Sequence, residues 1–161
     1  MKTGKIRIPP GILKKIKHLK YEHSPHIDIP ITWKKYPKAC LQHFEYGSKQ
    51  GVLEWFKCFA PKKSNKVGFL FSKLESGHMV PEHKDHFTNF AKFHKVKNKN
   101  SIKRRLVFVE DWKPGHYFQV GHVPFINWKS GDYVEWGKND KHFGGNLGMS
   151  PRYVLQVTYT S

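Results

Sequence analysis

From residue 66 to the end of the chain, short runs of β-branched and aromatic residues alternate with turn signals. The runs are VGFLF, HMVPEHKD, RRLVFVE, HYFQV, VPFIN, DYVEW, KHFGG and RYVLQVTYT, and turn sequences such as KPG, KSGD and GMSP separate them. Runs of this length at this spacing predict about eight strands in an antiparallel sandwich or barrel. The fold class that we expect is therefore mainly β.

The first third of the chain has a different pattern. Residues 10–20 begin with Pro-Gly and then carry apolar side chains at helical spacing, which predicts a short helix. Farther on, Ile27, Ile29 and Ile31 alternate with polar residues as they would in a strand. Residues 50–59 fit a helix and a strand equally well.

The chain length of 161 residues fits one domain, in which residues 1–65 buttress a β core over residues 66–161. With 38% hydrophobic residues, the chain can bury a core and is not disordered. No apolar run is long enough to span a membrane, and the basic N-terminus lacks the apolar stretch of a secretory signal. Cys40 and Cys58 are too few for a disulfide framework. We therefore expect a cytoplasmic protein without a membrane partner.

The chain is strongly basic, with 29 Lys and Arg residues against 12 acidic residues and a net charge of +17. Such a charge favours nucleic acids or acidic protein surfaces as partners. Residues 92–105 (KFHKVKNKNSIKRR) are especially rich in lysine and contain no acidic residue. We expect this stretch to be a long loop between the second and third strands of the core, and loops of this length are commonly functional.

A histidine followed two residues later by an acidic residue occurs at His26, His43 and His83, so the spacing alone is weak support for a metal site. Residues i and i+2 of a strand face the same way, so His83 and Asp85 can reach one metal ion. His142, farther along the chain, can supply a second imidazole. Two imidazoles and one carboxylate form the facial triad of non-haem Fe(II) oxygenases.

The order His83-x-Asp85, His142 and Arg152 resembles the motif of the 2-oxoglutarate/Fe(II)-dependent oxygenases. The sequence GHMVPEH before the first pair, HFGGN at the distal histidine and PRY around the arginine also fit that family. The resemblance covers residues 66–160 and includes partial likeness to the prolyl and aspartyl/asparaginyl hydroxylases. It implies a double-stranded β-helix, the jelly-roll barrel that cupins share. The resemblance does not extend to residues 1–65, which we expect to add the short N-terminal helix and a buttressing segment.

The resemblance also implies roles for individual residues. The three metal ligands would bind Fe(II), with 2-oxoglutarate and O2 at the remaining positions, and Arg152 would hold the far carboxylate of 2-oxoglutarate as a two-pronged donor. Tyr117 and Ser150 are candidates for a hydroxyl partner of that carboxylate. Arg105 would be a second arginine directed at the co-substrate, or only the end of the basic loop. Asn146 would orient a ligating histidine or a co-substrate oxygen.

The sequence favours two other interpretations of the motif less. His26-x-Asp28 with His94 and Arg104 repeats the spacing, although it leaves most of the β region after the motif. A cupin metal site shares the barrel, but cupins usually carry a further histidine where Asp85 stands and a glutamate shortly after it. Residues 87–99 contain no glutamate, and Arg152 would have no role in such a site.

The function that we expect is hydroxylation of a protein or peptide side chain, with release of succinate and CO2. The alternatives are the same chemistry on a nucleic acid or small metabolite, and a basic β-barrel binding module without catalysis. For a nucleic-acid partner, Trp33, Tyr36, Trp112 and Trp136 are the candidate stacking residues. The expected partner is a protein or acidic peptide, with nucleic acid as the alternative that the net charge suggests.

Overall fold

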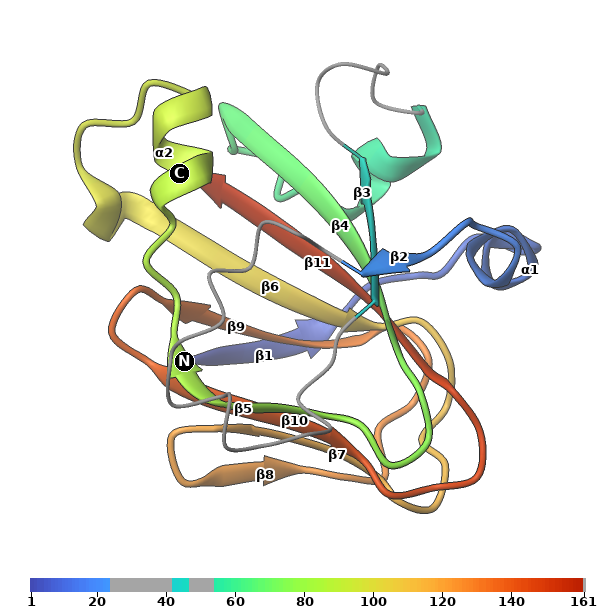
Figure 1. Cartoon of the computed structure of the whole chain (residues 1–161). Helices are drawn as coiled ribbons and strands as arrows, with labels where there is room; N and C mark the ends of the chain where they lie inside the picture. Colours follow the sequence, from blue (N-terminus) through green and yellow to red (C-terminus); the bar gives the residue numbers. More distant parts are fainter. Residues whose placement is uncertain (24–41, 47–53, 161) are drawn as a thin grey trace.

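The computed structural model describes residues 1–23, 42–46 and 54–160, which form two antiparallel β-sheets packed face to face (Figure 1). In spatial order, the seven-stranded sheet contains β1 (Lys2–Lys5), β9 (Asp132–Gly137), β6 (Ile102–Phe108), β11 (Arg152–Thr160), β4 (Lys66–Leu74), β3 (Gln42–Tyr46) and β2 (Glu22–His23). The four-stranded sheet contains β5 (Met79–Lys84), β10 (Lys141–Asn146), β7 (His116–Val120) and β8 (Val123–Phe125). We call them the large and the small sheet.

The helical elements are short: α1 (Ile12–Lys17), α2 (Thr88–Phe93) and the 3-10 turns η3 (Glu54–Phe59) and η4 (Lys99–Ser101). Among the described residues, no helix has the length and apolarity needed to cross a membrane.

The eight strands predicted from residue 66 onward are all present, as β4 to β11. From β4 to β11 the chain passes repeatedly between the two sheets, which is the winding of a double-stranded β-helix. The predicted fold class, mainly β with a jelly-roll barrel, is confirmed.

Two apolar layers hold the sheets, and strand β6 contributes to both. Leu106 and Phe108 pack between the sheets, against Phe118 of β7. Val107 and Val109, one position out of phase, face the other side of the large sheet. This division follows from the alternation of side chains along a strand. Alternate side chains along β6 therefore face into the barrel, and those between them face the outer side of the large sheet.

The N-terminal segment covers the outer face of the large sheet. The predicted short helix is present as α1, and its Ile12 and Ile16 are buried with Phe71 of β4 and Phe56 of η3. Strand β1 pairs with β9, and β3 pairs with β4, so this segment also widens the large sheet. Within the stretch that fitted helix and strand equally, residues 54–59 form a 3-10 turn.

The expected strand at Ile27, Ile29 and Ile31 lies outside the described residues.

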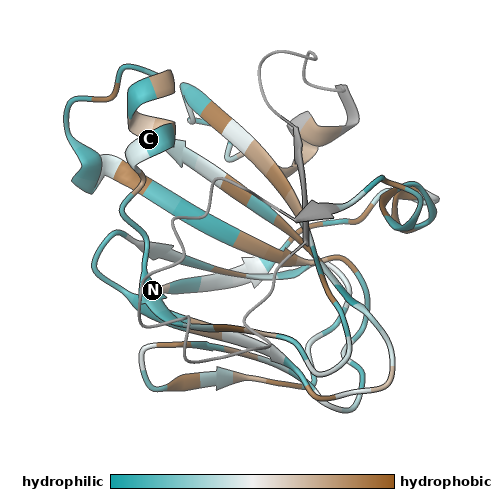
Figure 2. Ribbon diagram, viewed as in Figure 1, coloured by the Kyte–Doolittle hydropathy of each residue, from teal (hydrophilic) through white to brown (hydrophobic). Residues whose placement is uncertain are grey.

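The prediction of a long loop over residues 92–105 is wrong. This stretch contains the end of α2, the turn η4 and the first residues of β6, although most of it is hydrophilic (Figure 2). Phe87, Ala91 and Ile102 are buried together and anchor the stretch. The high lysine content concealed these apolar positions, which are spread over two elements.

The substitution Ile16→Ala tests whether α1 buttresses the large sheet. Ile16 is fully buried, so the variant should lose about 2–5 kcal/mol of unfolding free energy in a urea titration. Leu147→Ala removes similar apolar atoms from a residue that is 80% exposed and should change the unfolding free energy by less than about 0.5 kcal/mol. Equal effects of the two substitutions would contradict the role of α1.

Candidate metal centre

The pairing of β5 with β10 brings His83 and His142 together across the small sheet. The two residues are direct partners in the register, and the centroids of their rings lie 4.1 Å apart. Asp85 follows two residues after His83 on the same side of the chain. One ligand atom from each of the three residues lies within 4.8 Å of the other two. In the part of the chain that the structure describes, no other three His, Cys, Asp or Glu residues are so close.

A β-bulge in β5 sets this arrangement. His142 pairs with His83 but Gly144 pairs with Val80, so β5 carries one residue more than β10 between the two pairs. Pro81 lies within the bulge, where its missing N–H does not interrupt the ladder. Bulges of this kind redirect side chains near functional sites.

The backbone orients both imidazole rings. Nδ1 of His83 lies 2.8 Å from the carbonyl oxygen of Pro81, and Nδ1 of His142 lies 3.2 Å from that of Asp140. A carbonyl oxygen only accepts a hydrogen bond, so Nδ1 carries the proton and Nε2 keeps its lone pair in each ring. Burial lowers the pKa of His142 to about 4 and also lowers that of His83. Both rings are therefore neutral near neutral pH, as metal binding requires.

The carboxylate of Asp85 is buried and linked to the large sheet. Its Oδ1 accepts a hydrogen bond from Nη1 of Arg104 at 2.6 Å, and its Oδ2 accepts one from the indole N–H of Trp136 at 3.0 Å. Burial works against the charged form, but Arg104, assisted by the histidines and the indole, holds the pKa of Asp85 below its usual range. Oδ2 also lies 3.6 Å from Nε2 of His142.

These side chains fit a divalent metal ion. Two neutral imidazoles and one ionised carboxylate match the donor set of a facial triad, which suits non-haem Fe(II) and leaves coordination positions for other ligands. The structure thus brings together His83, Asp85 and His142 as a group that could bind a metal ion, and we call these three residues the metal group.

Arg152 is a buried cation beside this group. Its side chain extends from β11 toward the small sheet, where Nη1 donates a hydrogen bond to the carbonyl oxygen of Tyr117. Its Nε has no hydrogen-bond partner, and no ion pair joins Arg152 to a described acidic residue. Burial lowers its pKa to about 10, so the guanidinium stays charged. A buried cation without an anion is costly, and a bound carboxylate would offset that cost.

Gly144 makes room for the guanidinium. A Cβ atom at this position would lie 2.8 Å from Nη2 of Arg152. Gly144 is two residues from His142 on β10 and faces the same way, about 7 Å along the strand. The guanidinium of Arg152 therefore lies against the next inward-facing position of β10 after His142.

Two other predicted site residues, Tyr117 and Asn146, have different surroundings from those expected. The hydroxyl of Tyr117 donates to Oε1 of Gln119 at 2.6 Å, so only the Tyr117 backbone meets Arg152. Nδ2 of Asn146 donates to the carbonyls of Leu74 and Ser150, which holds the turn before β11. Ser150 accepts one of these bonds with its main-chain carbonyl, and the role of its hydroxyl stays a prediction. Tyr117 differs because Phe118, its neighbour, is the residue that faces into the barrel.

Arg105 also differs from the expectation that it faces the co-substrate. It lies on the outer face of β6, where it donates two hydrogen bonds to Glu135, at 3.0 and 3.2 Å, and lies over the ring of Tyr133. Arg104 is the inward residue and bonds to Asp85. Leu106, Val107, Phe108 and Val109 are all apolar and all buried, so the sequence has no alternation here that could have identified Arg104.

The alternative ligand set is only partly within the described structure. His94 ends α2, with its ring centroid 4.4 Å from that of Phe90, and Arg104 is bonded to Asp85. His26 and Asp28 lie outside the described residues. Of the candidate stacking residues, Trp136 is buried at the metal group, whereas Trp33 and Tyr36 are also outside the described part.

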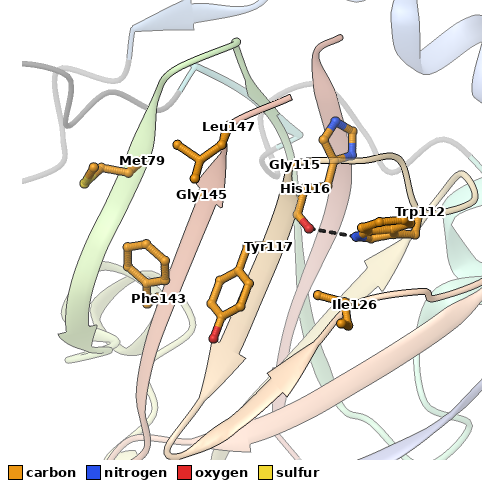
Figure 3. A pocket seen from close by; sticks show the side chains of 9 residues that line it. All are labelled: Met79, Trp112, Gly115, His116, Tyr117, Ile126, Phe143, Gly145 and Leu147. Carbon is orange, nitrogen blue, oxygen red and sulfur yellow. Dashed lines mark hydrogen bonds between the residues drawn. The ribbon is translucent and has the colours of Figure 1, made fainter. Parts of the chain in front are cut away.

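A separate apolar hollow of about 350 Å³ lies on the outer face of the small sheet (Figure 3). It is lined by Met79, Trp112, Gly115, His116, Tyr117, Ile126, Phe143, Gly145 and Leu147. Phe143 and Gly145 alternate along β10 with the inward residues His142 and Gly144, so the hollow and the metal group are on opposite faces of this strand.

Comparisons with known proteins support the fold. No family model matches the sequence, and no curated protein matches it. A prolyl-4-hydroxylase from Pseudomonas putida is structurally similar, with a TM-score of 0.54 and 13% sequence identity over 75% of this chain and 71% of that one. A "predicted oxalate decarboxylase" from Thermotoga maritima has a TM-score of 0.50 and 16% identity over 90% of this chain and 96% of that one. The chain therefore has a cupin-like double-stranded β-helix fold.

The substitution Arg104→Met tests the electrostatics of the metal group. It leaves Asp85 buried without its cation and should lower the unfolding free energy of the metal-free chain by about 3 kcal/mol. A bound metal ion would replace the missing positive charge. We therefore expect Co(II) to raise the unfolding midpoint more in this variant than in the wild type.

The matched control is Lys129→Met, which removes the exposed ion pair with Asp111 and should leave stability nearly unchanged. A smaller Co(II) effect in Arg104→Met than in the wild type would show that Arg104 is needed to direct Asp85 toward the metal.

Proposed function

We propose that this protein is an Fe(II)- and 2-oxoglutarate-dependent dioxygenase that hydroxylates its substrate. The observation that carries the proposal is Arg152, a buried arginine without an acidic partner among the described residues, beside a His-Asp-His group. A barrel that bound only a metal would have no need of this cation. A dicarboxylate co-substrate needs both a metal ion and a cation at a distance from it.

In this proposal, different side chains bind the metal ion and orient its carboxylate ligand. His83, Asp85 and His142 would hold Fe(II), and Arg104 with Trp136 orients the carboxylate of Asp85. When bound, iron with 2-oxoglutarate and O2 supplies oxidative decarboxylation of the co-substrate coupled to hydroxylation of the substrate, with release of succinate and CO2.

Arg152 would bind the far carboxylate of 2-oxoglutarate, because a guanidinium offers two parallel donors to one carboxylate. Its Nε lacks a partner, and Gly144 keeps the space beside Nη2 clear of a side chain. Apolar residues between the sheets, including Phe118 and Val154, keep water from this part of the barrel. In a dry environment, the attraction between the guanidinium and a carboxylate is stronger than in water.

The expected substrate, a protein or peptide side chain, stays a prediction. The alternative of a nucleic-acid substrate is favoured by one observation, the lysine-rich surface that joins Asp85 to Arg104 along the chain. A metal-dependent cupin enzyme that uses no 2-oxoglutarate is the remaining enzymatic alternative, and it leaves Arg152 without a role.

The proposal predicts that Arg152→Lys weakens 2-oxoglutarate binding. Lysine keeps the positive charge but cannot make the two-pronged contact, and loss of one hydrogen bond to a charged group corresponds to about a tenfold or greater rise in Kd. The measurement is an anaerobic titration of the Fe(II)-loaded chain with 2-oxoglutarate, followed by the visible charge-transfer band of the chelate. His142→Ala should abolish the band.

Arg105→Lys is the matched control, because Arg105 lies on the outer face of the same sheet, and its Kd should stay close to that of the wild type. Gly144→Ala provides a second variant, since its methyl group would displace the guanidinium without removing it. Iron binding without 2-oxoglutarate binding in the wild type would favour the cupin alternative. Absence of both would favour a basic binding module.

A further inference from the structure

The chain between Asp85 and Arg104 forms a lysine-rich surface that is fixed to the metal group at both ends. Residues 86–103 contain five lysines and no acidic residue. The segment starts directly after Asp85, and the residue after its end, Arg104, returns to bond the same carboxylate at 2.6 Å. This surface, which we call the 86–103 surface, therefore lies beside the metal group.

The surface is ordered rather than a loose charged tail. Phe87, Ala91 and Ile102 are buried together beneath it, and Phe90 and Val96 pack against them. The guanidinium of Arg104 also lies over the ring of Phe87, at 5.2 Å. The lysines thus project from a fixed backbone.

The charges of this surface are available to a ligand. Lys92, Lys95 and Lys97 are exposed, and no ion pair joins them to an acidic side chain among the described residues. Lys84, just before the segment, is exposed as well. Exposed cations of this kind favour binding to the phosphates of a nucleic-acid backbone.

An aromatic ring stands among these lysines. Phe93 is 57% exposed, whereas Phe90 of α2 and Phe87, just before the helix, pack into the cluster beneath it. Its ring meets that of His94 edge-on, at 4.9 Å between centroids. Single-stranded nucleic acids bind to surfaces of this composition, with phosphates on lysines and bases stacked on aromatic rings.

The depth of the metal group favours a single strand over a duplex. Asp85 and His142 are buried between the sheets, and a base within a duplex cannot reach a buried site unless it leaves the stack.

We propose that the 86–103 surface binds single-stranded nucleic acid, with the lysines on its phosphates and Phe93 stacked on a base. This binding does not depend on the metal chemistry, but naming the strand as the substrate rests on the proposed function.

The test is a fluorescence-anisotropy titration of the full metal-free chain with a labelled single-stranded oligonucleotide at several salt concentrations. The double substitution Lys95→Gln and Lys97→Gln should make the negative slope of log K against log salt shallower, by about 0.7 for each phosphate that is no longer neutralised. Lys14→Gln with Lys15→Gln removes the same charge from α1, at the far side of the molecule from α2 (Figure 1), and should leave the slope unchanged.

Phe93→Ala should weaken binding of the single strand about tenfold while leaving the salt slope and the affinity for a duplex unchanged. Since Phe93 is exposed, this variant should fold normally. Unchanged affinity in Phe93→Ala, or equal losses in the two lysine pairs, would overturn the proposal. A labelled poly-glutamate peptide that bound as tightly, with the same dependence on Phe93, would assign the surface to acidic peptides instead.

Succinate release by the iron-loaded chain separates the two proposals. An increase with the oligonucleotide that disappears in Phe93→Ala would assign the strand as the substrate. Binding without such an increase would remove the strand as the substrate but keep the binding surface. Failure of the wild type to bind 2-oxoglutarate would count against the proposed function and leave the anisotropy result unaffected.

Discussion

The buried ion pair between Asp85 and Arg104 governs how the metal group is built. A carboxylate removed from water needs a cation or several donors to remain charged, and Asp85 obtains both from the other sheet. Arg104 comes from β6 and Trp136 from β9, whereas the histidines come from β5 and β10. The packing of the two sheets and the orientation of the metal ligands are consequently set by the same contacts.

The two inward-facing arginines of the large sheet differ in what surrounds them. Arg104 has its carboxylate within the protein, and its Nε is also held by Thr158. Arg152 has a backbone carbonyl as its partner and an Nε without one. This difference separates a cation that supports the metal group from one that is suited to an incoming carboxylate. The proposal of a dicarboxylate co-substrate rests on this difference.

The fold shows where part of the positive charge of the chain lies. A net charge of +17 by itself indicates only a preference for polyanions. The return of the chain from Asp85 to Arg104 places five of the lysines beside the metal group, on a segment with its own apolar anchor. A polyanion bound to these lysines would therefore lie on a segment that begins and ends at the metal group.

Local patterns in the sequence determined much of this protein. Alternating apolar runs and turn residues predicted the eight strands, since side-chain period and backbone reversal are local properties. The spacing of His83 and Asp85 predicted that they share a face, and the motif linked them to His142 and Arg152. Only the tertiary structure decided which of two adjacent residues enters the barrel: Arg104 rather than Arg105, and Phe118 rather than Tyr117.

The reason is that a shift of one residue reverses every side chain of a strand, and its direction is set by long-range pairing. The pairing of β6 with β11 and β9 decided that parity for the two arginines. The bulge at Pro81 and the backbone carbonyls that orient the imidazoles likewise come from register. The sequence by itself determined which chemical groups are present and along which strands. Contacts between distant segments decided which of them meet.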